Sequence, residues 1–467
     1  MIDTIFREYD IRGKVGTEFI ISEVYPLTQA IVYYFKQHKP SVKTVAVGMD
    51  ARTTSPQIKD EVIRALTDSG LDVLFIGICP TPVLYFALYT QPVDAGIMIT
   101  ASHNPPEYNG LKLCLGKHSV WGLQVAEICD LYKQGAKLPA STQGSVTDQP
   151  LIPLYVEWLA DHFKDLHAMQ LSAVVDCGNG TAGTVMPLLV QAMGWHHVQL
   201  LYAEVDGTCP NHEADPVKEK NMQEVKQVLA TTDIQVGIGF DGDVDRMAPM
   251  TKQGFLVPGD QLLALFSQQV LNEHPGAPIV VDIKSSAGLL DLLQEWGAQT
   301  VLSPSGHAII KDQMRKHHAL LGGELSCHFF FNDRYFGYDD GIYAALRVFE
   351  ILIKTGKTLD ELLAMFPKLY STPEFRIPCN ESDKKRIVEA VTALFAQRPD
   401  VAMITIDGVR ARMEYGWGIL RASNTQPELC LRFESDTQQG LQQVKEVFFN
   451  ALKPYVDASR LKQLIGL

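Results

Sequence analysis

The 467-residue sequence lacks any apolar run of about 18 residues, the length that a helix needs to cross a bilayer. It also lacks the start of a signal peptide, because Asp3 and Glu8 stand where a basic start and then an apolar run are needed. These absences disfavour a membrane-spanning or a secreted protein. We therefore expect a cytoplasmic protein.

Paired cysteines and basic tracts are also missing. The eight cysteines form no Cys-x-x-Cys pair, in a chain too long to need disulfide staples, so free thiols are predicted. Lys and Arg number 41 against 54 Asp and Glu, a net charge of −13, and they are dispersed. This balance disfavours nucleic acid and membrane surfaces as partners, although a few converging cations could still bind an anionic substrate.

Low-complexity segments are absent as well, so we expect the chain to fold throughout. Hydrophobic residues make up 46% and charged residues 20% of the sequence, which is typical of globular proteins. Domains usually hold about 100–200 residues, so two to four domains are expected.

Three segments share a pattern that predicts α/β domains. Each joins a β-branched run to a segment of helical period and then to a Gly-marked turn, as buried parallel strands that feed helices do. The three runs are Thr44–Asp50, Ser172–Gly178 and Pro278–Lys284. The last hundred residues differ, with one helix-like stretch followed by pairs of strand-like runs. The predicted fold class is α/β, with three tandem related α/β domains and a smaller C-terminal α+β domain.

The predicted domain boundaries follow from this pattern. They divide the chain into residues 1–148, 149–252, 253–367 and 368–467. Two segments rich in Pro, Ser and Thr are predicted to be linkers, namely Ser141–Pro153 and Phe366–Pro378.

Ser102 follows the strand-like run Asp94–Thr100 and precedes Asn104-Pro105, which forces a turn. Ligands gather at the carboxyl ends of strands in α/β sheets, so its hydroxyl is a candidate nucleophile, although most such serines only form turns. A hydrolase is disfavoured, because no Gly-x-Ser-x-Gly is present and a sequence neighbour such as His103 seldom points at the same atom. Phosphoryl chemistry suits Ser102 better.

Asn109-Gly110 predicts a tight turn after the serine, and Lys112 follows it. Lys112 could neutralise a phosphate or act as an acid or base. A solvated surface charge is the alternative.

The hexapeptide Asp241–Arg246 places three carboxylates at alternate positions between two apolar, strand-like runs. Repulsion would keep Asp241, Asp243 and Asp245 apart unless a hard cation collects them. An EF-hand is excluded, because Arg246 and Lys252 stand where its loop needs Gly and Glu. The set fits Mg²⁺ with room for a phosphate beside Arg246, and a solvated acidic turn is the alternative.

Gly237–Gly242 matches the Gly-x-Gly-x-x-Gly spelling of dinucleotide sites. That motif works where the glycines open a helix, whereas an acidic loop and a second strand-like run follow here. No nicotinamide or flavin cofactor is predicted.

Gly322–His328 alternates an acid, a hydroxyl and an imidazole. In an extended chain Glu324, Ser326 and His328 would face one side, which suits a polyol. His328 also titrates in the range useful for proton transfer, although three Phe residues follow it and a core histidine is the alternative.

The segment that begins at Arg421 separates two strand-like runs with a guanidinium and short polar side chains. Arg421 with Ser423, Asn424 and Thr425 suits a phosphate clamp, and a plain polar hairpin is the alternative. Other side chains are weaker candidates that alone fit a structural role better, and these are Tyr9, Arg12, Lys284 and His307.

In this order and across nearly the whole chain, these segments resemble the α-D-phosphohexomutase family. Four stretches carry the resemblance: Thr100–Pro105, Asp241–Arg246, Gly323–His328 and Arg421–Thr425. Residues 322–341 look most like the bacterial phosphomannomutase/phosphoglucomutase members. Cys327 stands where a Gly is frequent in the family, and Ala101 and Leu111 replace other common residues. The family fold has three related α/β domains and a smaller fourth domain around a central cleft.

The resemblance implies a mutase that interconverts hexose 1-phosphate and hexose 6-phosphate, with mannose and also glucose as the sugar, through a phosphoserine enzyme. It implies one Mg²⁺ per chain, a hexose 1,6-bisphosphate as intermediate or activator, and a monomer or weak dimer. A phosphoglucosamine mutase is one alternative. A catalytically silent sugar-phosphate-binding regulator is the other, although neither the serine loop nor the metal loop is damaged.

The resemblance also implies roles for single residues. Phosphorylated Ser102 would be held with the metal by Asp241, Asp243 and Asp245. Lys112, His328 and Arg12 would handle protons, and His103 is a further catalytic candidate. The implied substrate-binding residues are Tyr9, Arg246, Lys284, His307, Glu324, Ser326, His328, Arg421, Ser423, Asn424 and Thr425.

Overall fold

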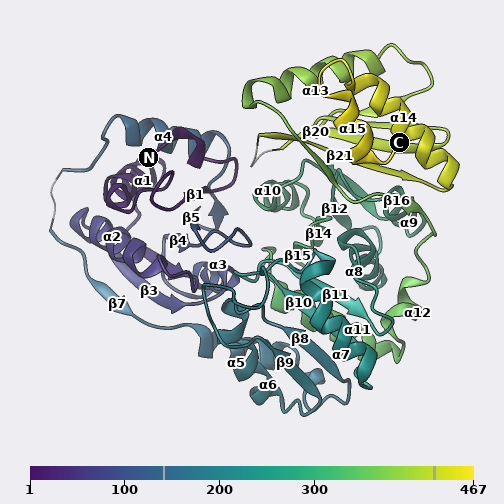
Figure 1. Ribbon diagram of the computed structural model, residues 1–467. Helices are drawn as coiled ribbons and strands as arrows, with labels where there is room; N and C mark the ends of the chain where they lie inside the picture. The colour runs from purple at the N-terminus through teal and green to yellow at the C-terminus, as the bar shows by residue number, and fades with distance from the viewer. Residues whose placement is uncertain (140–141, 424–426) are drawn as a thin grey trace. The chain divides into compact units, whose positions relative to one another are not determined.

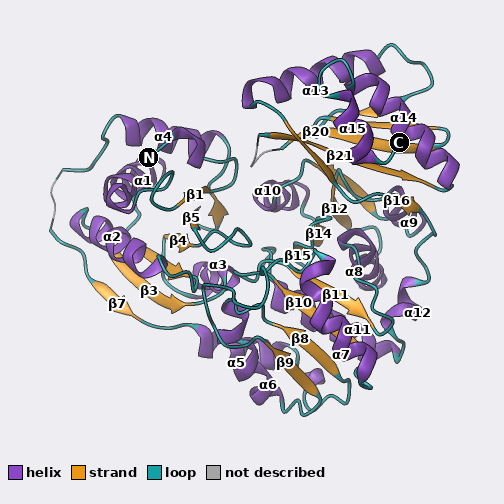
Figure 2. Ribbon diagram, viewed as in Figure 1, coloured by secondary structure: helices purple, strands orange, loops and turns teal. Residues whose placement is uncertain are grey.

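The computed structural model describes residues 1–139, 142–423 and 427–467 (Figure 1). The chain divides into two compact units. Unit 1 comprises Met1–Gln269 with Ser326–Leu363, and unit 2 comprises Val270–Leu325 with Ala364–Leu467. Both units combine strands with packed helices (Figure 2).

The first sheet of unit 1 follows the path β1–β5–β4–β2–β3–β7, with β6 beside β5. β2 pairs in parallel with β3 and β4, whereas β5 runs antiparallel to β4 and β1. The strands are β1 (Ile11–Lys14), β2 (Thr44–Met49), β3 (Asp72–Ile78), β4 (Ala95–Ile99), β5 (Tyr108–Leu115), β6 (His118–Ser119) and β7 (Val146–Asp148). The helices are α1 (Val24–His38), α2 (Ser55–Asp68), α3 (Thr81–Thr90) and α4 (Leu123–Lys133).

Two helices of this sheet show how sequence pattern sets packing. α2 is amphipathic, because its buried Ile58, Val62 and Leu66 recur every four residues and so share one face. α3 is apolar all round and buried from Thr81 to Leu88, as expected for a helix covered on several sides. The main core of unit 1 joins α1, α2 and α4 to the sheet.

The second sheet of unit 1 has the order β11–β10–β8–β9, with β8 parallel to β9 and β10, and β11 antiparallel to β10. The strands are β8 (Ala173–Asp176), β9 (Val198–Leu201), β10 (Val236–Phe240) and β11 (Met247–Thr251). The helices are α5 (Ile152–His162), α6 (Met186–Met193) and α7 (Gln223–Thr231). Further elements of unit 1 are β15 (Phe329–Phe331), α11 (Gly341–Thr355) and α12 (Leu359–Leu363), and α8 (Gly259–Glu273) runs across the unit boundary. Short 3₁₀ turns span Asp3–Ile5, Ile21–Glu23, Lys164–Leu166, Thr181–Thr184 and Glu219–Met222.

Unit 2 contains a parallel set, in which β12 pairs with β13 and β14, and a C-terminal antiparallel sheet. The first set comprises β12 (Pro278–Asp282), β13 (Gln299–Ser303), β14 (Leu321–Gly323), α9 (Ala287–Glu295) and α10 (His307–His317). The second sheet runs β16–β21–β20–β19–β18, with β17 beside β21. Its elements are β16 (Tyr370–Ser371), β17 (Phe375–Pro378), β18 (Ala402–Ile404), β19 (Val409–Met413), β20 (Gly416–Ala422), β21 (Glu428–Ser435), α13 (Glu381–Phe395), α14 (Gln438–Leu452) and α15 (Ala458–Ile465).

The predicted fold class is confirmed. The three β-branched runs form β2, β8 and β12, each in parallel pairs. The glycines that follow α2, α6 and α9 have positive φ, with Gly70 at 77°, Gly194 at 64° and Gly297 at 74°. This left-handed conformation ends a helix at little cost for a residue without Cβ.

The two segments predicted to be linkers instead contain short strands. β7 lies within Ser141–Pro153 and pairs with β3, and β16 and β17 lie within Phe366–Pro378 and pair with β21. Pro is tolerated at such sheet edges, where a missing N–H costs no ladder bond. A segment rich in Pro, Ser and Thr can therefore be either a linker or an edge strand, and composition alone does not distinguish the two.

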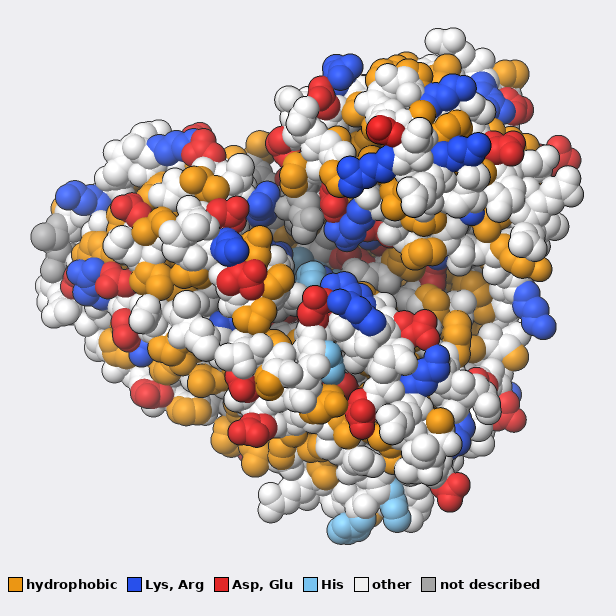
Figure 3. Space-filling view, in the orientation of Figure 1, with side chains coloured by type: hydrophobic (Ala, Val, Ile, Leu, Met, Phe, Trp, Pro, Cys, Tyr) orange, Lys and Arg blue, Asp and Glu red, His pale blue; other side chains and the backbone are white. Residues whose placement is uncertain are grey.

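Charged side chains of both signs lie on the face drawn in Figure 3, where Lys and Arg are interspersed with Asp and Glu. All eight cysteines are free thiols, as predicted. Among the described residues, no helix has both the length and the apolar character that a bilayer crossing requires.

Candidate active site

The loop Asp241–Arg246 joins β10 to β11 in unit 1 and brings three carboxylates together. Asp241, Asp243 and Asp245 are each at most 1% exposed, and one oxygen from each lies within 4.8 Å of the others. Val244 has a φ of 64°, which is strained for a β-branched residue, and it turns the loop sharply between the last two carboxylates. Buried carboxylates this close repel one another strongly unless a cation compensates them.

Lys112 on β5 supplies part of that compensation. Its Nζ lies 2.8 Å from Asp243 Oδ2 and 2.5 Å from Asp245 Oδ2. Burial alone would lower the pKa of Lys112, but the carboxylates of Asp243 and Asp245 raise it above its ordinary value. Lys112 is therefore a buried ammonium, and its alternative as a solvated surface charge is wrong.

The three carboxylates still have unused capacity for a metal ion. Burial, followed by the charges of Asp245 and Asp243, raises the pKa of Asp241 well above its ordinary value, so its ionisation is not fully compensated. Within the described part of the chain, buried Asp243 Oδ1 has no hydrogen-bond donor. Oxygen ligands with a spare buried acceptor fit a hard divalent cation. The chain thus contains an acidic group that could hold a metal.

Ser102 lies beside this cluster. It follows β4 with a φ of 52°, and its N–H donates to Thr100 Oγ1 at 2.9 Å. Its Oγ donates to Asp241 Oδ2 at 3.0 Å, although the two residues are 139 positions apart. The predicted serine and the predicted metal loop therefore meet.

His103 contacts the same hydroxyl, with Nδ1 3.1 Å from Ser102 Oγ. Burial lowers the pKa of His103 well below its ordinary value, and the charges of Arg246 and Arg12 lower it further. His103 is therefore a neutral imidazole at neutral pH. The expectation that a sequence neighbour would point elsewhere is wrong here, because the left-handed turn at Ser102 brings both side chains together.

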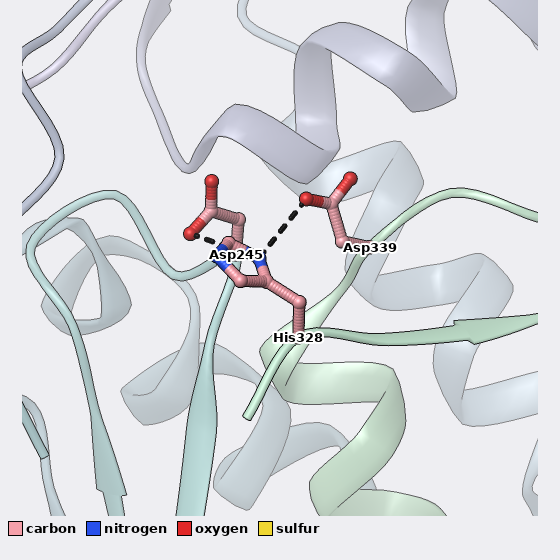
Figure 4. Close-up of side chains that lie close together, drawn as sticks. All are labelled: Asp245, His328 and Asp339. Atoms are coloured by element: carbon pink, nitrogen blue, oxygen red, sulfur yellow. Dashed lines mark hydrogen bonds and ion pairs between the residues drawn. The ribbon is translucent and has the colours of Figure 1, made fainter. Parts of the chain in front are cut away.

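His328 connects Arg246 to two carboxylates, as Figure 4 shows in part. Arg246 Nε donates to His328 Nε2 at 2.9 Å, and His328 Nδ1 lies 3.1 Å from Asp339 Oδ2 and 3.6 Å from Asp245 Oδ1. Since a guanidinium only donates, Nε2 accepts and the ring proton belongs on Nδ1, toward Asp339. His328 is thus a buried histidine within a network of charged groups.

Arg12 on β1 reaches the serine loop. Its Nε donates to Asp10 Oδ1 at 2.9 Å, and its NH1 donates to Asn104 Oδ1 at 2.8 Å. Burial alone would lower the pKa of Arg12, but the carboxylate of Asp10 raises it, so the guanidinium stays charged. Tyr9 is buried close by in sequence, at the start of the same strand region.

In unit 2, Lys284, Glu324 and Arg421 are buried, and the charges of Glu324 and Arg421 both act on Lys284. Lys284 Nζ lies 3.5 Å from Glu374 Oε2 and 3.6 Å from Asp282 Oδ2. Burial alone would lower the pKa of Lys284, but Glu374 and Asp282 raise it, Arg421 opposes them and Glu324 adds to them. These charges form a second polar cluster.

The rest of the predicted phosphate clamp is partly visible. Arg421 lies within β20, one residue before its end, rather than in the loop, and its Nε donates to Asp407 Oδ2 at 3.0 Å. The Ser423 carbonyl accepts from Lys384 Nζ at 2.7 Å. His307 begins α10 and is buried. Asn424 and Thr425 lie outside the described residues.

Two local predictions about backbone are wrong. Asn109-Gly110 is not a turn but part of β5, because β1 approaches so closely that a Cβ on Gly110 would stand 2.3 Å from the Ile11 carbonyl oxygen. Residues 324–328 are not extended but form a turn between β14 and β15, with Cys327 at a φ of 67°. Glu324, Ser326 and His328 therefore do not share a strand face.

Comparison with known proteins places the chain in a family. Models described as phosphoglucomutase/phosphomannomutase match in order: alpha/beta/alpha domain I over 3–138, domain II over 153–254, domain III over 258–370 and the C-terminal domain over 374–451. A phosphomannomutase/phosphoglucomutase of Pseudomonas syringae pv. tomato is 40% identical over 452 residues, 97% of this chain and 95% of that protein. The chain belongs to the phosphoglucomutase/phosphomannomutase family.

Further relatives of the family agree. A phosphoglucomutase of Neisseria gonorrhoeae is 38% identical over 445 residues, 95% of each protein. The crystal structure of a phosphoglucomutase/phosphomannomutase family protein from Burkholderia thailandensis is similar at a TM-score of 0.88 and 33% identity, over 97% of this chain and 98% of that chain. The resemblance seen in the sequence is thereby confirmed.

One departure from the family pattern now has a structural setting. Cys327 stands where the family often has Gly, and its φ of 67° is one that Gly adopts without a steric penalty. Its carbonyl accepts from the Met247 N–H at 3.2 Å, at the start of β11. The Cys327 side chain is buried.

Several residues that contact the candidate site residues were not found from sequence. Arg52 and Asp50 support the serine loop, Thr81 Oγ1 donates to Asp243 Oδ2 at 2.6 Å, and Asp339 contacts His328. Asp50 and Arg52 lie in the segment that follows β2, and Thr81 begins α3 shortly after β3, so all three stand near the carboxyl edge where ligands gather. Their position after the end of a predicted strand was the sequence signal that could have identified these residues.

Proposed function

We propose that this protein interconverts hexose 1-phosphates and hexose 6-phosphates, with mannose and glucose as sugars, through a phosphoserine at Ser102 and a bisphosphorylated sugar. The observation that carries the proposal is the 3.0 Å hydrogen bond from Ser102 Oγ to Asp241 within a buried three-carboxylate cluster. The names of the relatives support the same reaction, since they are phosphomannomutases and phosphoglucomutases.

Mg²⁺ is the proposed metal, with Asp241, Asp243, Asp245 and the Ser102 oxygen as its ligands. Mg²⁺ prefers few carboxylates and completes its shell with phosphate and water, which fits the three buried aspartates. When bound it would stabilise negative charge on the transferring phosphoryl group. Lys112 contributes fixed positive charge to the same cluster.

In the proposed transfer, the bond between Ser102 Oγ and phosphorus breaks while a free sugar hydroxyl forms a new bond to that phosphorus. The hydroxyl proton passes to a neutral acceptor. Of the candidate groups, His103 and His328 could accept this proton, whereas Lys112 is held as an ammonium and so favours the role of proton donor. The reverse step at the other phosphate of the bisphosphorylated sugar returns a phosphoryl group to Ser102.

We assign Arg12 to charge compensation rather than to proton transfer, because its guanidinium stays protonated beside Asp10. Arg246 has the same proposed role, held by His328. Both cations lie in unit 1 with the serine and the carboxylates. Electrostatic stabilisation of this kind supplies most of the catalysis in phosphoryl transfer.

Substrate recognition is proposed for the remaining candidates. Arg421, Ser423, Asn424 and Thr425 would bind the phosphate that does not react. Glu324 and Ser326 would accept and donate hydrogen bonds at sugar hydroxyls, with Tyr9, Lys284 and His307 as further contacts. The charge cluster of Lys284, Glu324 and Arg421 in unit 2 supports this assignment. We also propose the four-domain division at residues 148, 252 and 367.

Turnover of three substrates tests the proposed function. Purified protein with Mg²⁺ and a trace of hexose 1,6-bisphosphate should convert mannose 1-phosphate and glucose 1-phosphate to the 6-phosphates, each followed by a coupled assay. Glucosamine 1-phosphate should be a poor substrate. Turnover of the glucosamine phosphate alone would instead indicate a phosphoglucosamine mutase, and no turnover of any of the three would contradict a mutase function.

A further inference from the structure

The loop Ala101–Glu107 that carries Ser102 has no regular secondary structure between β4 and β5. Its own backbone provides few hydrogen bonds, among them Asn104 N to the Ala101 carbonyl at 3.0 Å and Tyr108 N to the Pro105 carbonyl at 3.0 Å. Pro105 and Pro106 cannot donate at all. Carbonyls of this loop are therefore left to accept from donors outside the loop.

Arg52 supplies those donors. Its NH1 donates to the Pro105 carbonyl at 2.7 Å and to the Tyr108 carbonyl at 2.9 Å. Its NH2 donates to the Ser102 carbonyl at 2.7 Å and to the Asn104 carbonyl at 2.6 Å. One guanidinium thus bonds four carbonyls spread along the serine loop and into the first residue of β5.

The remaining guanidinium N–H, on Nε, fixes the orientation of the Arg52 side chain. Arg52 Nε donates to Asp50 Oδ2 at 3.1 Å, and Asp50 Oδ1 accepts from the Arg52 N–H at 3.0 Å and from Ser55 Oγ at 2.7 Å. All five N–H groups of Arg52 are therefore used, and the side chain is 8% exposed. Because the fork is planar and rigid, it sets the spacing of the carbonyls that it binds.

Arg52 stands between two regular elements. Asp50 directly follows β2, and Ser55 begins α2. Asn109 Nδ2 donates to Thr54 Oγ1 at 2.9 Å and to Ser55 Oγ at 3.0 Å, which ties β5 to the same helix start. The serine loop is thereby held against the regular framework of the first sheet.

We infer that Arg52 is a positioning residue that holds the backbone of the serine loop so that Ser102 Oγ stays at the carboxylate cluster. The expected fall in kcat rests on the proposed function. The expected effect on the position of the serine loop rests on the hydrogen bonds alone. Arg52 bonds only protein carbonyls and Asp50, so it acts on the phosphoryl group through Ser102. Its loss should lower kcat and leave the KM for the hexose phosphate nearly unchanged.

Arg52→Ala is the first variant, and we expect kcat to fall by about 100-fold, the cost of a misplacement near 1 Å. Arg52→Lys keeps the charge but offers three tetrahedral donors instead of the planar fork, so it should recover only part of the rate. A cavity of about 110 Å³ is lined by Arg52, Ser102 and Gly242. Methylguanidinium at millimolar concentration should therefore enter Arg52→Ala and restore kcat in part.

Arg64→Ala is the matched control, because Arg64 stands on the neighbouring α2 with an exposed side chain paired to Glu61. It should leave kcat, KM and the response to methylguanidinium unchanged. The thermal midpoint of every variant is recorded, so that a folding defect in Arg52→Ala is recognised and Arg52→Lys then provides the decisive comparison.

Hydrogen exchange separates this inference from the proposed function. Amides in residues 101–108 should exchange faster in Arg52→Ala and Arg52→Lys than in the wild type, and methylguanidinium should slow them again in Arg52→Ala. If the amides of residues 101–108 exchanged in Arg52→Ala as slowly as in the wild type, the assignment of Arg52 would be overturned. A kcat of Arg52→Ala close to that of the wild type would overturn it as well. An inactive wild-type protein with the expected exchange pattern would contradict only the mutase function.

Discussion

The candidate site is a set of buried charges that compensate one another residue by residue. Asp241, Asp243 and Asp245 are balanced in part by Lys112, whose ammonium contacts two of them. The remaining uncompensated charge is the physical reason why this group could hold a metal ion. A buried charge that loses its partner is costly, so each member of such a set should affect both stability and metal response.

Lys112→Met tests this balance. Without the ammonium, the free energy of unfolding should fall by on the order of 3 kcal/mol or more, because two buried carboxylates lose their partner. Added Mg²⁺ should recover part of the loss, since it would bind the folded carboxylates. Urea unfolding with and without Mg²⁺ measures both effects.

Lys133→Met is the control for Lys112, because Lys133 pairs with Asp3 at the surface, where the side chains are 47% and 70% exposed. An ion pair this exposed contributes little to the free energy of unfolding, and Mg²⁺ should not alter it. Equal losses in the two variants, or no Mg²⁺ response in Lys112→Met, would contradict the assignment of Lys112 to the carboxylate cluster.

Whole elements are fixed by similar charge networks away from the site. Glu350 on α11 accepts from Arg334 NH1 at 3.1 Å and from Lys354 Nζ at 3.0 Å, and Gln269 Nε2 of α8 donates to it at 3.1 Å. Burial alone would raise the pKa of Glu350, but the bonds from Arg334 and Lys354 lower it to about 2. The network joins α11 to α8.

Glu350→Gln should show how this network depends on pH. The folded-state pKa lies below the ordinary value, so the ionised carboxylate stabilises the fold above about pH 4.5 and the effect disappears as pH falls toward 2. At pH 7 the free energy of unfolding of the wild type should be larger than that of Glu350→Gln by on the order of 3 kcal/mol. This difference in unfolding free energy should become smaller below pH 4.5. Unfolding free energies between pH 3 and 7 measure it.

Glu361→Gln is the control for this experiment, because Glu361 only caps the start of α12 from an exposed position. Glu361→Gln should change the free energy of unfolding much less than Glu350→Gln does between pH 3 and 7. A constant difference between wild type and Glu350→Gln from pH 7 to pH 3 would show that Glu350 is not ionised in the network.

Across the whole molecule, features set by neighbours in sequence were predictable and features set by distant contacts were not. β2, β8 and α9 follow from local apolar patterns, and the metal loop follows from three carboxylates at alternate positions. β7 and β17 were missed because each pairs with a strand far away in the chain. Pairing partners leave no local signal.

The same distinction applies to the site. Ser102 was found because it stands between a strand-like run and a turn. Lys112 was found because it follows the serine closely in the sequence. Arg52 was missed, since its role depends on carbonyls about 50 residues away that composition does not reveal. Gly110 was assigned to a turn because the close approach of β1, which actually requires Gly there, is a contact between strands.

The central claim for the whole molecule is that a phosphoryl group passes through Ser102, and intact mass tests it most directly. The wild-type protein is weighed before and after phosphatase treatment, together with Ser102→Ala, and mutase activity is measured on each sample. We expect a wild-type species that carries one phosphoryl group, which phosphatase removes. Ser102→Ala should carry none and should lack mutase activity. A Ser102→Ala protein that remains fully active without phosphorylation would contradict the account.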